Sequence, residues 1–121
     1  MQYAHARLAG IFRTAGEEGF KIEELRKSPI DLGRPEAQVL AKKILSFGDA
    51  LEGALHDQEV TGLLWYLREL AESFHRYYTE VRVVDPADRP GSLSRLKLCG
   101  VVRKILHTTL TTLGIRAPDR M

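Results

Sequence analysis

Apolar residues recur every three or four positions through most of this chain, and this spacing restricts the chain to a helical fold. The longest such pattern is predicted to begin at Thr61-Gly62. Its apolar stripe comprises Leu63, Leu67, Leu70, Ala71, Phe74, Tyr78 and Val81. Its opposite, charged face comprises Arg68, Glu69, Glu72 and Arg76. Because no segment shows the sustained alternation of a strand, the pattern predicts an all-α protein.

Four further helices are predicted from the same spacing. Two of them contain the apolar residues Ala4, Leu8, Ile11, Phe12 and Ala15, and Ala37, Leu40, Ala41, Ile44 and Leu45. The other two contain Leu51, Ala54 and Leu55, which are expected to face inward, and Leu96, Cys99, Val102, Leu106, Leu110 and Leu113. We therefore expect a single domain over residues 1–121, folded as a bundle of about five helices.

Glycine and proline residues mark the boundaries of these helices. The first helix is expected to end at Gly16 and Gly19, and the Gly-, Glu- and Lys-rich residues that follow are interpreted as a connector. Pro35 suits the first turn of the second helix, where its missing N–H is not needed. Gly114 followed by Ile115 is typical of a helix that ends at a glycine with an apolar contact across the end.

The composition excludes several classes of protein. Of the 121 residues, 44% are hydrophobic and 28% are charged, which is the balance of a folded globular domain. The formal net charge of +2 is too small to indicate nucleic-acid binding, so any basic surface must be local. The lone Cys99 excludes an internal disulfide and favours a reducing, cytoplasmic compartment. No apolar run is long enough to span a membrane, so no membrane association is expected.

No motif in the chain indicates catalysis. There is no glycine-rich phosphate loop and no Cys/His spacing for a metal, so neither a catalytic residue nor a metal site is predicted. Cys99 falls on an apolar stripe and is expected to be a buried, unreactive thiol. The acidic pairs lie on solvated segments or helix faces, where nothing would shift their pKa. The residues alone therefore indicate a helical binding or interaction module rather than a complete enzyme.

Three segments of the chain are similar to those of one known family. They are QYAHAR at 2–7, YLRELAESFHRYYTEVRVV at 66–84 and SRLKLCGVVRKILHTTLTTLGIRAPDRM at 94–121. In combination they resemble the DALR-type anticodon-binding domain of arginyl-tRNA synthetase, a class I aminoacyl-tRNA synthetase. The resemblance covers nearly the whole chain. Departures from the family pattern, which put local loop geometry in doubt, are Gly48, Val60 and Asp119.

The resemblance implies a role and two partners. It implies that the domain binds the anticodon loop of arginine-accepting tRNA. It also implies that the chain is the C-terminal part of a longer, ATP-dependent arginine–tRNA ligase, whose catalytic domain precedes it and contacts it. ATP and arginine would bind that catalytic domain, so no cofactor is expected here, and the chain alone is not expected to activate arginine.

The resemblance also implies which residues contact the RNA. These are Tyr3, Arg7, Tyr78, Arg82 and Met121. Tyr3 and Arg7 are four residues apart, so they present a ring and a guanidinium on one helix face. Tyr78 and Arg82 lie one turn apart at a helix end. Met121 ends a tail that is expected to lie back near the binding face, where Arg116 and Arg120 could add phosphate contacts.

From the residues alone, each of these assignments has an alternative. Tyr3 and Arg7 could instead pack against the catalytic domain that the resemblance implies, or could belong to a simple helix pair. Tyr78 lies four residues after Phe74 on the apolar stripe, so it is also a candidate core residue. His5 and Tyr77 are interpreted as packing residues, and Trp65 as a rim-packed indole. Arg103, Lys104 and His107 are interpreted as an ordinary solvated face.

A different function is also compatible with the same fold. A freestanding helical module could keep this bundle and bind a protein partner instead of RNA. Retention of Tyr3, Arg7, Tyr78 and Met121 favours the RNA-binding interpretation, because a module that binds only protein does not need them.

Overall fold

The computed structural model describes residues 1–120, which contain six α-helices and no strand. The helices are α1 (Gln2–Glu17), α2 (Ile22–Lys27), α3 (Pro35–Leu45), α4 (Phe47–Asp57), α5 (Thr61–Glu80) and α6 (Arg89–Thr112). The all-α prediction is confirmed, and five of the six helices are those that the apolar spacing predicted. The sixth, α2, lies in the segment that we interpreted as a connector. It packs against α6 and is held by a two-pronged contact between Arg89 and Glu24, with N–O distances of 2.7 Å.

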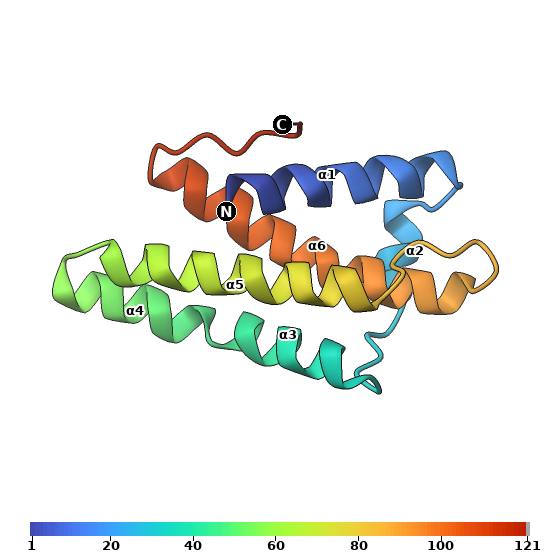
Figure 1. Cartoon of the computed structure of the whole chain (residues 1–121), viewed down its shortest axis with the longest axis horizontal. Helices are drawn as coiled ribbons and strands as arrows, with labels where there is room; N and C mark the ends of the chain where they lie inside the picture. Colours follow the sequence, from blue (N-terminus) through green and yellow to red (C-terminus); the bar gives the residue numbers. More distant parts are fainter. Residues whose placement is uncertain (121) are drawn as a thin grey trace.

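Helix α5 runs through the middle of the bundle (Figure 1). It packs against α3 and α4 on one side and against α1 and α6 on the other. The core lies between these helices, and most of its fully buried members are apolar. They include Leu8, Leu40, Leu67, Leu70, Phe74, Leu96, Val102, Leu106 and Leu110. Cys99 is buried among them as expected, and burial raises the pKa of its thiol to about 12.

The end of α6 turns the chain back over the bundle. Gly114 adopts a left-handed conformation with φ of +76°. The amide of Gly114 donates to the Thr111 carbonyl, and the amide of Ile115 donates to the Leu110 carbonyl at 2.8 Å. This pair of bonds is the Schellman arrangement, and it confirms the predicted glycine-terminated helix. The tail that follows lies along α1 (Figure 1).

Two neighbouring tyrosines in α5 lie in different surroundings, and Tyr77 is a packing residue, as the sequence interpretation expected. Tyr77 is 2% exposed and belongs to the core, whereas Tyr78 is 39% exposed. The two positions follow Phe74 by three and four residues, so they lie on opposite flanks of the apolar stripe and spacing alone could not separate them. The surroundings of the two side chains separate them. Tyr77 packs into the core, whereas Tyr78 faces the open groove beside α1. Burial raises the pKa of Tyr77 to about 12.

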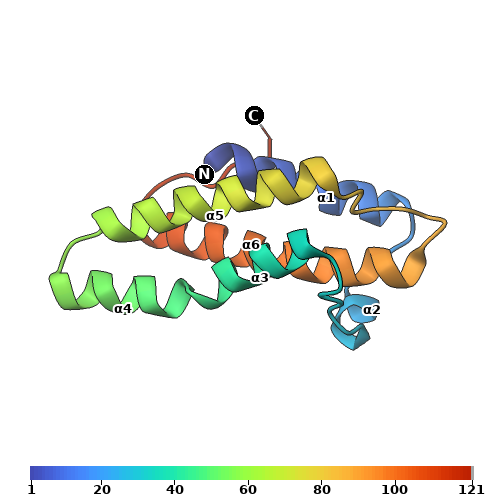
Figure 2. The ribbon, with the colours of Figure 1, turned by 60° about the horizontal axis from the view of Figure 1, so that its bottom comes forward.

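The prediction for α4 is wrong. Leu51, Ala54 and Leu55 were expected to face inward, but no residue of α4 is buried, and Leu55 is 72% exposed. Within residues 1–120, α4 packs against α5 and α3 and reaches neither α1 nor α6. Figure 2 shows it at one end of the molecule. The periodicity was correct, but none of residues 1–120 covers the outer flank of the helix. Within the same residues, no helix is long and apolar enough to cross a membrane.

Candidate nucleic-acid interface

The side chain of Arg7 lies between two tyrosine rings. Its guanidinium carbon is 4.9 Å from the ring centre of Tyr3 and 4.5 Å from that of Tyr78. Its Nη2 donates to the Tyr3 hydroxyl at 2.8 Å. A guanidinium stacked on aromatic faces keeps its plane fixed and its N–H edge available. The structure therefore brings together three of the five predicted site residues, from α1 and from the end of α5.

Two further residues support this stack. The ring of His75 lies 5.5 Å from that of Tyr3, and its Nδ1 is 3.5 Å from Nη1 of Arg7. Burial and, secondarily, the charge of Arg7 lower the pKa of His75, so that its neutral form is favoured. Phe74 is fully buried beneath the stack, with its ring 6.1 Å from that of Tyr78. Tyr78 is thus an exposed ring on a buried base, which is the geometry of a stacking platform.

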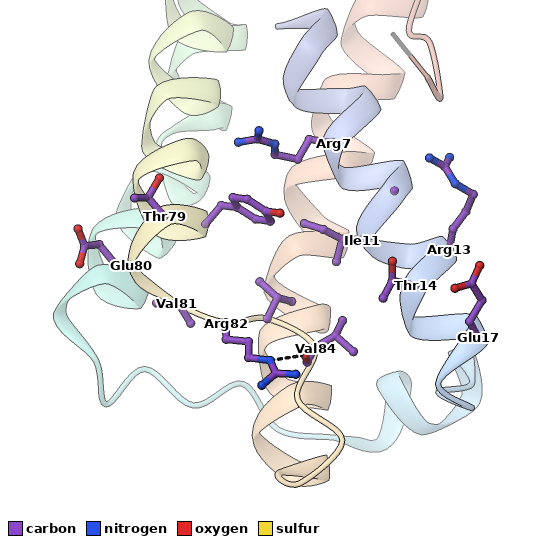
Figure 3. Close-up of a pocket in the computed structure, with 13 residues that line it drawn as sticks. Arg7, Ile11, Arg13, Thr14, Glu17, Thr79, Glu80, Val81, Arg82 and Val84 are labelled. Carbon is purple, nitrogen blue, oxygen red and sulfur yellow. Dashed lines mark hydrogen bonds between the residues drawn. The ribbon is translucent and has the colours of Figure 1, made fainter.

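An open groove of about 690 Å³ begins at the stack and runs between α1 and the end of α5. Arg7 extends across it from α1 toward α5, and Arg82 lies at its lower end (Figure 3). The Nε of Arg82 donates to the Val84 carbonyl at 3.2 Å, which leaves its two terminal nitrogens available. Arg82 is therefore in the same groove as the stack, but it does not touch the tyrosines.

A second groove of about 390 Å³ adjoins the first. Both are lined by Arg7, Gly10 and Arg13, so they form one continuous surface over the exposed face of α1. Arg120 and Asp119 of the tail line the second groove. The predicted return of the tail to this face is thus observed up to Arg120. Met121, the fifth predicted residue, lies outside the described residues.

The sequence interpretation missed three contributors to this surface. His75 and Arg13 were not assigned any role, and Gly10 was not among the predicted site residues. Arg13 lies three residues after Gly10, which itself lies three residues after Arg7, so the helical spacing would have placed Arg13 beside Gly10 at the groove edge. The role of His75 could not have been found in that way, because it depends on the approach of α1 to α5.

The other residues that the sequence analysis considered lie outside the stack. His5 is 1% exposed, which confirms it as a packing residue. Trp65 is 57% exposed at the start of α5, with the Arg68 guanidinium 5.5 Å from its ring centre. Arg103 packs over Phe12 and lies 3.9 Å from the Asp119 carboxylate. The strip formed by Arg103, Lys104 and His107 does not line either groove.

The charge along the surface is mixed but locally positive. Arg7, Arg13, Arg82 and Arg120 line the two grooves, together with the carboxylates Glu17, Glu80 and Asp119. The stack itself contains no carboxylate. Aromatic rings combined with arginines along an open groove are the elements that bind unpaired nucleic acid. The fold and this surface therefore define a class, that of all-α domains suited to unpaired nucleic-acid segments.

The comparisons with known proteins identify the family within that class. The family model for the DALR anticodon binding domain matches residues 1–121, and the chain belongs to that family. It is 40% identical to an arginine–tRNA ligase of Syntrophotalea carbinolica and 37% identical to one of Thermotoga maritima. Both matches cover 100% of this chain and 22% of the relative. The chain thus spans about a fifth of the length of these relatives.

A solved structure supports the same assignment. A crystal structure from Campylobacter jejuni, assigned as an arginyl-tRNA synthetase, superposes with a TM-score of 0.83 at 28% identity. The match covers 99% of this chain and 25% of that one. The anticodon-binding fold implied by the sequence resemblance is therefore confirmed.

Proposed function

We propose that this chain binds the anticodon loop of arginine-accepting tRNA as the C-terminal domain of an arginyl-tRNA synthetase. In that protein a separate catalytic domain would bind ATP and arginine, so this domain would need no cofactor of its own. The complete protein would be a cytoplasmic arginine–tRNA ligase. The observation that carries the proposal is the Tyr3–Arg7–Tyr78 stack beside a groove lined by arginines, in a chain of this family.

The chemistry of the stack suits a loop rather than a duplex. Proteins read RNA sequence mainly in loops, where unpaired bases can stack on aromatic rings and offer their edges to hydrogen bonds. Phosphates are held by arginine and lysine, which position the RNA without reading its sequence. All arginine codons have G in the middle, so every cognate anticodon has C in the middle. That base is the one whose identity the domain would be expected to read.

The test is a binding titration of the purified chain with the anticodon stem-loop of an arginine tRNA. With about 3–5 phosphate contacts, the affinity should fall steeply with salt, at about 0.7–0.9 log units per contact per log unit of salt. Replacement of the middle anticodon C should weaken binding, because a specific loop contact is lost. Arginine-dependent pyrophosphate exchange should not be detected with this chain alone.

The protein-binding alternative gives a different result in the same titration. A module that binds only protein would not distinguish a stem-loop with C in the middle from one with another base. Binding that is weak, independent of the anticodon and independent of salt would therefore overturn the proposal.

A further inference from the structure

The first two turns of α1 carry side chains on two faces, one toward the groove and one toward the C-terminal tail. Tyr3 and Arg7 face the groove, where they form the stack with Tyr78. Gln2 and His5 face the C-terminal tail, and Arg13 reaches the same tail two turns further along. Gln2, His5 and Arg13 are spaced by three and eight residues, which places them on one stripe of the helix. The opening segment of the chain therefore builds both the stack and the seat of the tail.

Three side chains on this stripe contact three backbone carbonyls of the tail. Nε2 of Gln2 donates to the Arg116 carbonyl at 2.8 Å. Nδ1 of His5 lies 2.8 Å from the Pro118 carbonyl, and Nη1 of Arg13 donates to the Asp119 carbonyl at 3.1 Å. Because these contacts are to backbone atoms, they fix the course of the tail whatever side chains the tail carries.

His5 is the buried member of this set. A carbonyl oxygen can only accept a hydrogen bond, so the proton in the contact with Pro118 must be on Nδ1 of His5. The other ring nitrogen, Nε2, is buried and has no hydrogen-bond partner among residues 1–120. The ring also stacks on that of His107, with the two centres 5.3 Å apart. One nitrogen of the ring therefore makes the tail contact, and the rest of the ring acts as an apolar, packed surface.

The position of the tail matters because the tail completes the second groove. Arg120 and Asp119 line that groove together with Tyr3 and Arg7, which are on the neighbouring stripe of α1. Pro118 restricts the residue before it to an extended conformation, which suits a tail that runs along the helix. If the tail left α1, Arg120 would leave the groove while the stack stayed in place.

We propose that His5 is a positioning residue, which holds the C-terminal tail on α1 and so places Arg120 beside the Tyr3–Arg7–Tyr78 stack for RNA binding. The RNA part of this inference rests on the proposed function. The tail part does not, since it can be measured without RNA.

Two substitutions of His5 separate the tail contact from the packing. His5→Phe keeps an aromatic ring against His107 and removes the Nδ1 donor, and it also removes the unpartnered Nε2. His5→Asn keeps an N–H donor near the place of Nδ1 and removes the ring. We therefore expect His5→Phe to keep the wild-type melting temperature and to lose the tail contact. We expect His5→Asn to keep the tail contact and to have a lower melting temperature.

The tail contact is measured by the rate at which trypsin cleaves after Arg116, followed by mass spectrometry as release of residues 117–121. Loss of one hydrogen bond should open the tail more often, so His5→Phe should be cleaved about 2- to 10-fold faster than wild type. His5→Asn should be cleaved at close to the wild-type rate. His56→Asn on α4, far from the tail, should change neither this rate nor RNA binding.

RNA binding is then measured in two backgrounds. In the full chain, His5→Phe should weaken binding of the arginine anticodon stem-loop about 2- to 10-fold, and His5→Asn should restore most of that loss. In a chain that ends at Ile115, which keeps the closure of α6, His5→Phe should have no further effect. This non-additivity would show that His5 acts through the tail.

Two other outcomes would count against either the inference about His5 or the proposed function. If RNA binding by the two variants follows their melting temperatures, or if His5→Phe is not cleaved faster, His5 is only a core residue and the inference is overturned. If His5→Phe is cleaved faster but the wild-type chain does not bind the stem-loop, the proposed function fails and the RNA role of His5 fails with it.

Discussion

The groove face and helix α4 both expose large apolar or aromatic side chains, but they hold them in different ways. At the groove, Tyr3 and Tyr78 are fixed by the Arg7 guanidinium between them and by Phe74 beneath. On α4, Leu51 and Leu55 are exposed without being part of the core, because no other helix of the described chain packs against the outer flank of α4. Exposure alone therefore does not indicate a binding site, whereas exposure combined with fixed geometry does.

The two regions also differ in charge. Residues 46–60 carry the four carboxylates Asp49, Glu52, Asp57 and Glu59 and no lysine or arginine. The grooves carry four arginines against three carboxylates. A phosphate backbone would be attracted to the groove face and repelled by α4. The chain thus separates its charges between two faces, which its net charge of +2 conceals.

The largest expected difference between the regions is in stability. Phe74→Ala removes a fully buried ring from beneath the stack, and it should lower the free energy of unfolding by about 3–5 kcal/mol. Leu55→Ala removes a side chain that is 72% exposed, and it should change that free energy by less than about 0.5 kcal/mol. Chemical denaturation measures both. A loss above about 2 kcal/mol for Leu55→Ala would show that α4 is covered in solution.

The second difference is in RNA binding, and two aromatic residues at opposite ends of α5 test it. Tyr78→Ala removes a stacking ring and should weaken binding of the arginine anticodon stem-loop by about 1–3 kcal/mol, or about 5- to 150-fold. Trp65→Ala removes an exposed ring near α4 and should leave binding unchanged. Binding is measured by fluorescence anisotropy at fixed salt.

Tyr78→Phe is the control for this pair. It keeps the ring and deletes the hydroxyl, so it should bind almost as well as wild type if stacking is what Tyr78 contributes. Because Tyr78 is partly exposed, the alanine variant should remain folded, which removes the core interpretation as an explanation. A folded Tyr78→Ala chain that binds like wild type would place the RNA surface elsewhere.

The comparison of the groove face with α4 also explains how much of the fold could be predicted from the sequence. The all-α class, the start of α5 at Thr61 and the end of α6 at Gly114 follow from local rules on apolar spacing and helix ends. Helix α2 was missed because it has only six residues and no buried side chain. The inward face of α4 was predicted wrongly because spacing shows which residues share a face, but not whether another helix lies opposite.

The candidate site was predictable in part for the same reason. Tyr3 and Arg7 are neighbours on one helix, so their pairing was visible in the sequence. That Tyr78 lies on the other side of Arg7 depends on how α1 crosses α5, and the spacing placed Tyr78 in the core stripe instead. The roles of His75 and of His5 depend on contacts between residues 68 and 113 positions apart, which no local pattern contains.

Two helical glycines, one in each region, give a third and smaller effect. A Cβ on Gly53 of α4 would meet no atom within 4 Å, and one on Gly10 of α1 would meet only the end of the Arg13 side chain at 3.4 Å. Alanine is favoured over glycine inside a helix, so Gly53→Ala and Gly10→Ala should each stabilise the chain by about 0.5–1 kcal/mol.

Only one of these two substitutions should affect RNA binding. Gly10 lines both grooves, so a methyl group there should weaken binding of the stem-loop, whereas Gly53→Ala should leave binding unchanged. Thermal unfolding and the binding titration measure the two effects separately. Equal binding by both variants would mean that the RNA does not approach α1 at Gly10.

The smallest expected effect is a pH dependence that belongs to the groove face. Burial and the charge of Arg7 lower the pKa of His75 in the folded chain, whereas an unfolded histidine has a pKa of about 6.5. The unfolded state therefore binds a proton at His75 more readily than the folded state does. By linkage, the stability that His75 contributes is fully present above about pH 6.5 and is lost as the pH falls from there toward the folded pKa.

Substitution of His75 isolates this contribution from that of the other histidines. Between pH 7.5 and pH 5, the free energy of unfolding of wild type should fall more than that of His75→Gln, which has no group to protonate. Arg7→Gln should reduce the difference, because the charge of Arg7 is one of the causes of the lowered pKa. Protonation of Nδ1 would also end its ability to accept from Arg7, so acid should loosen the stack before it affects α4. Equal pH dependence of wild type and His75→Gln would mean that neither burial nor Arg7 lowers the pKa of His75, and that His75 contributes no pH-dependent stability to the stack.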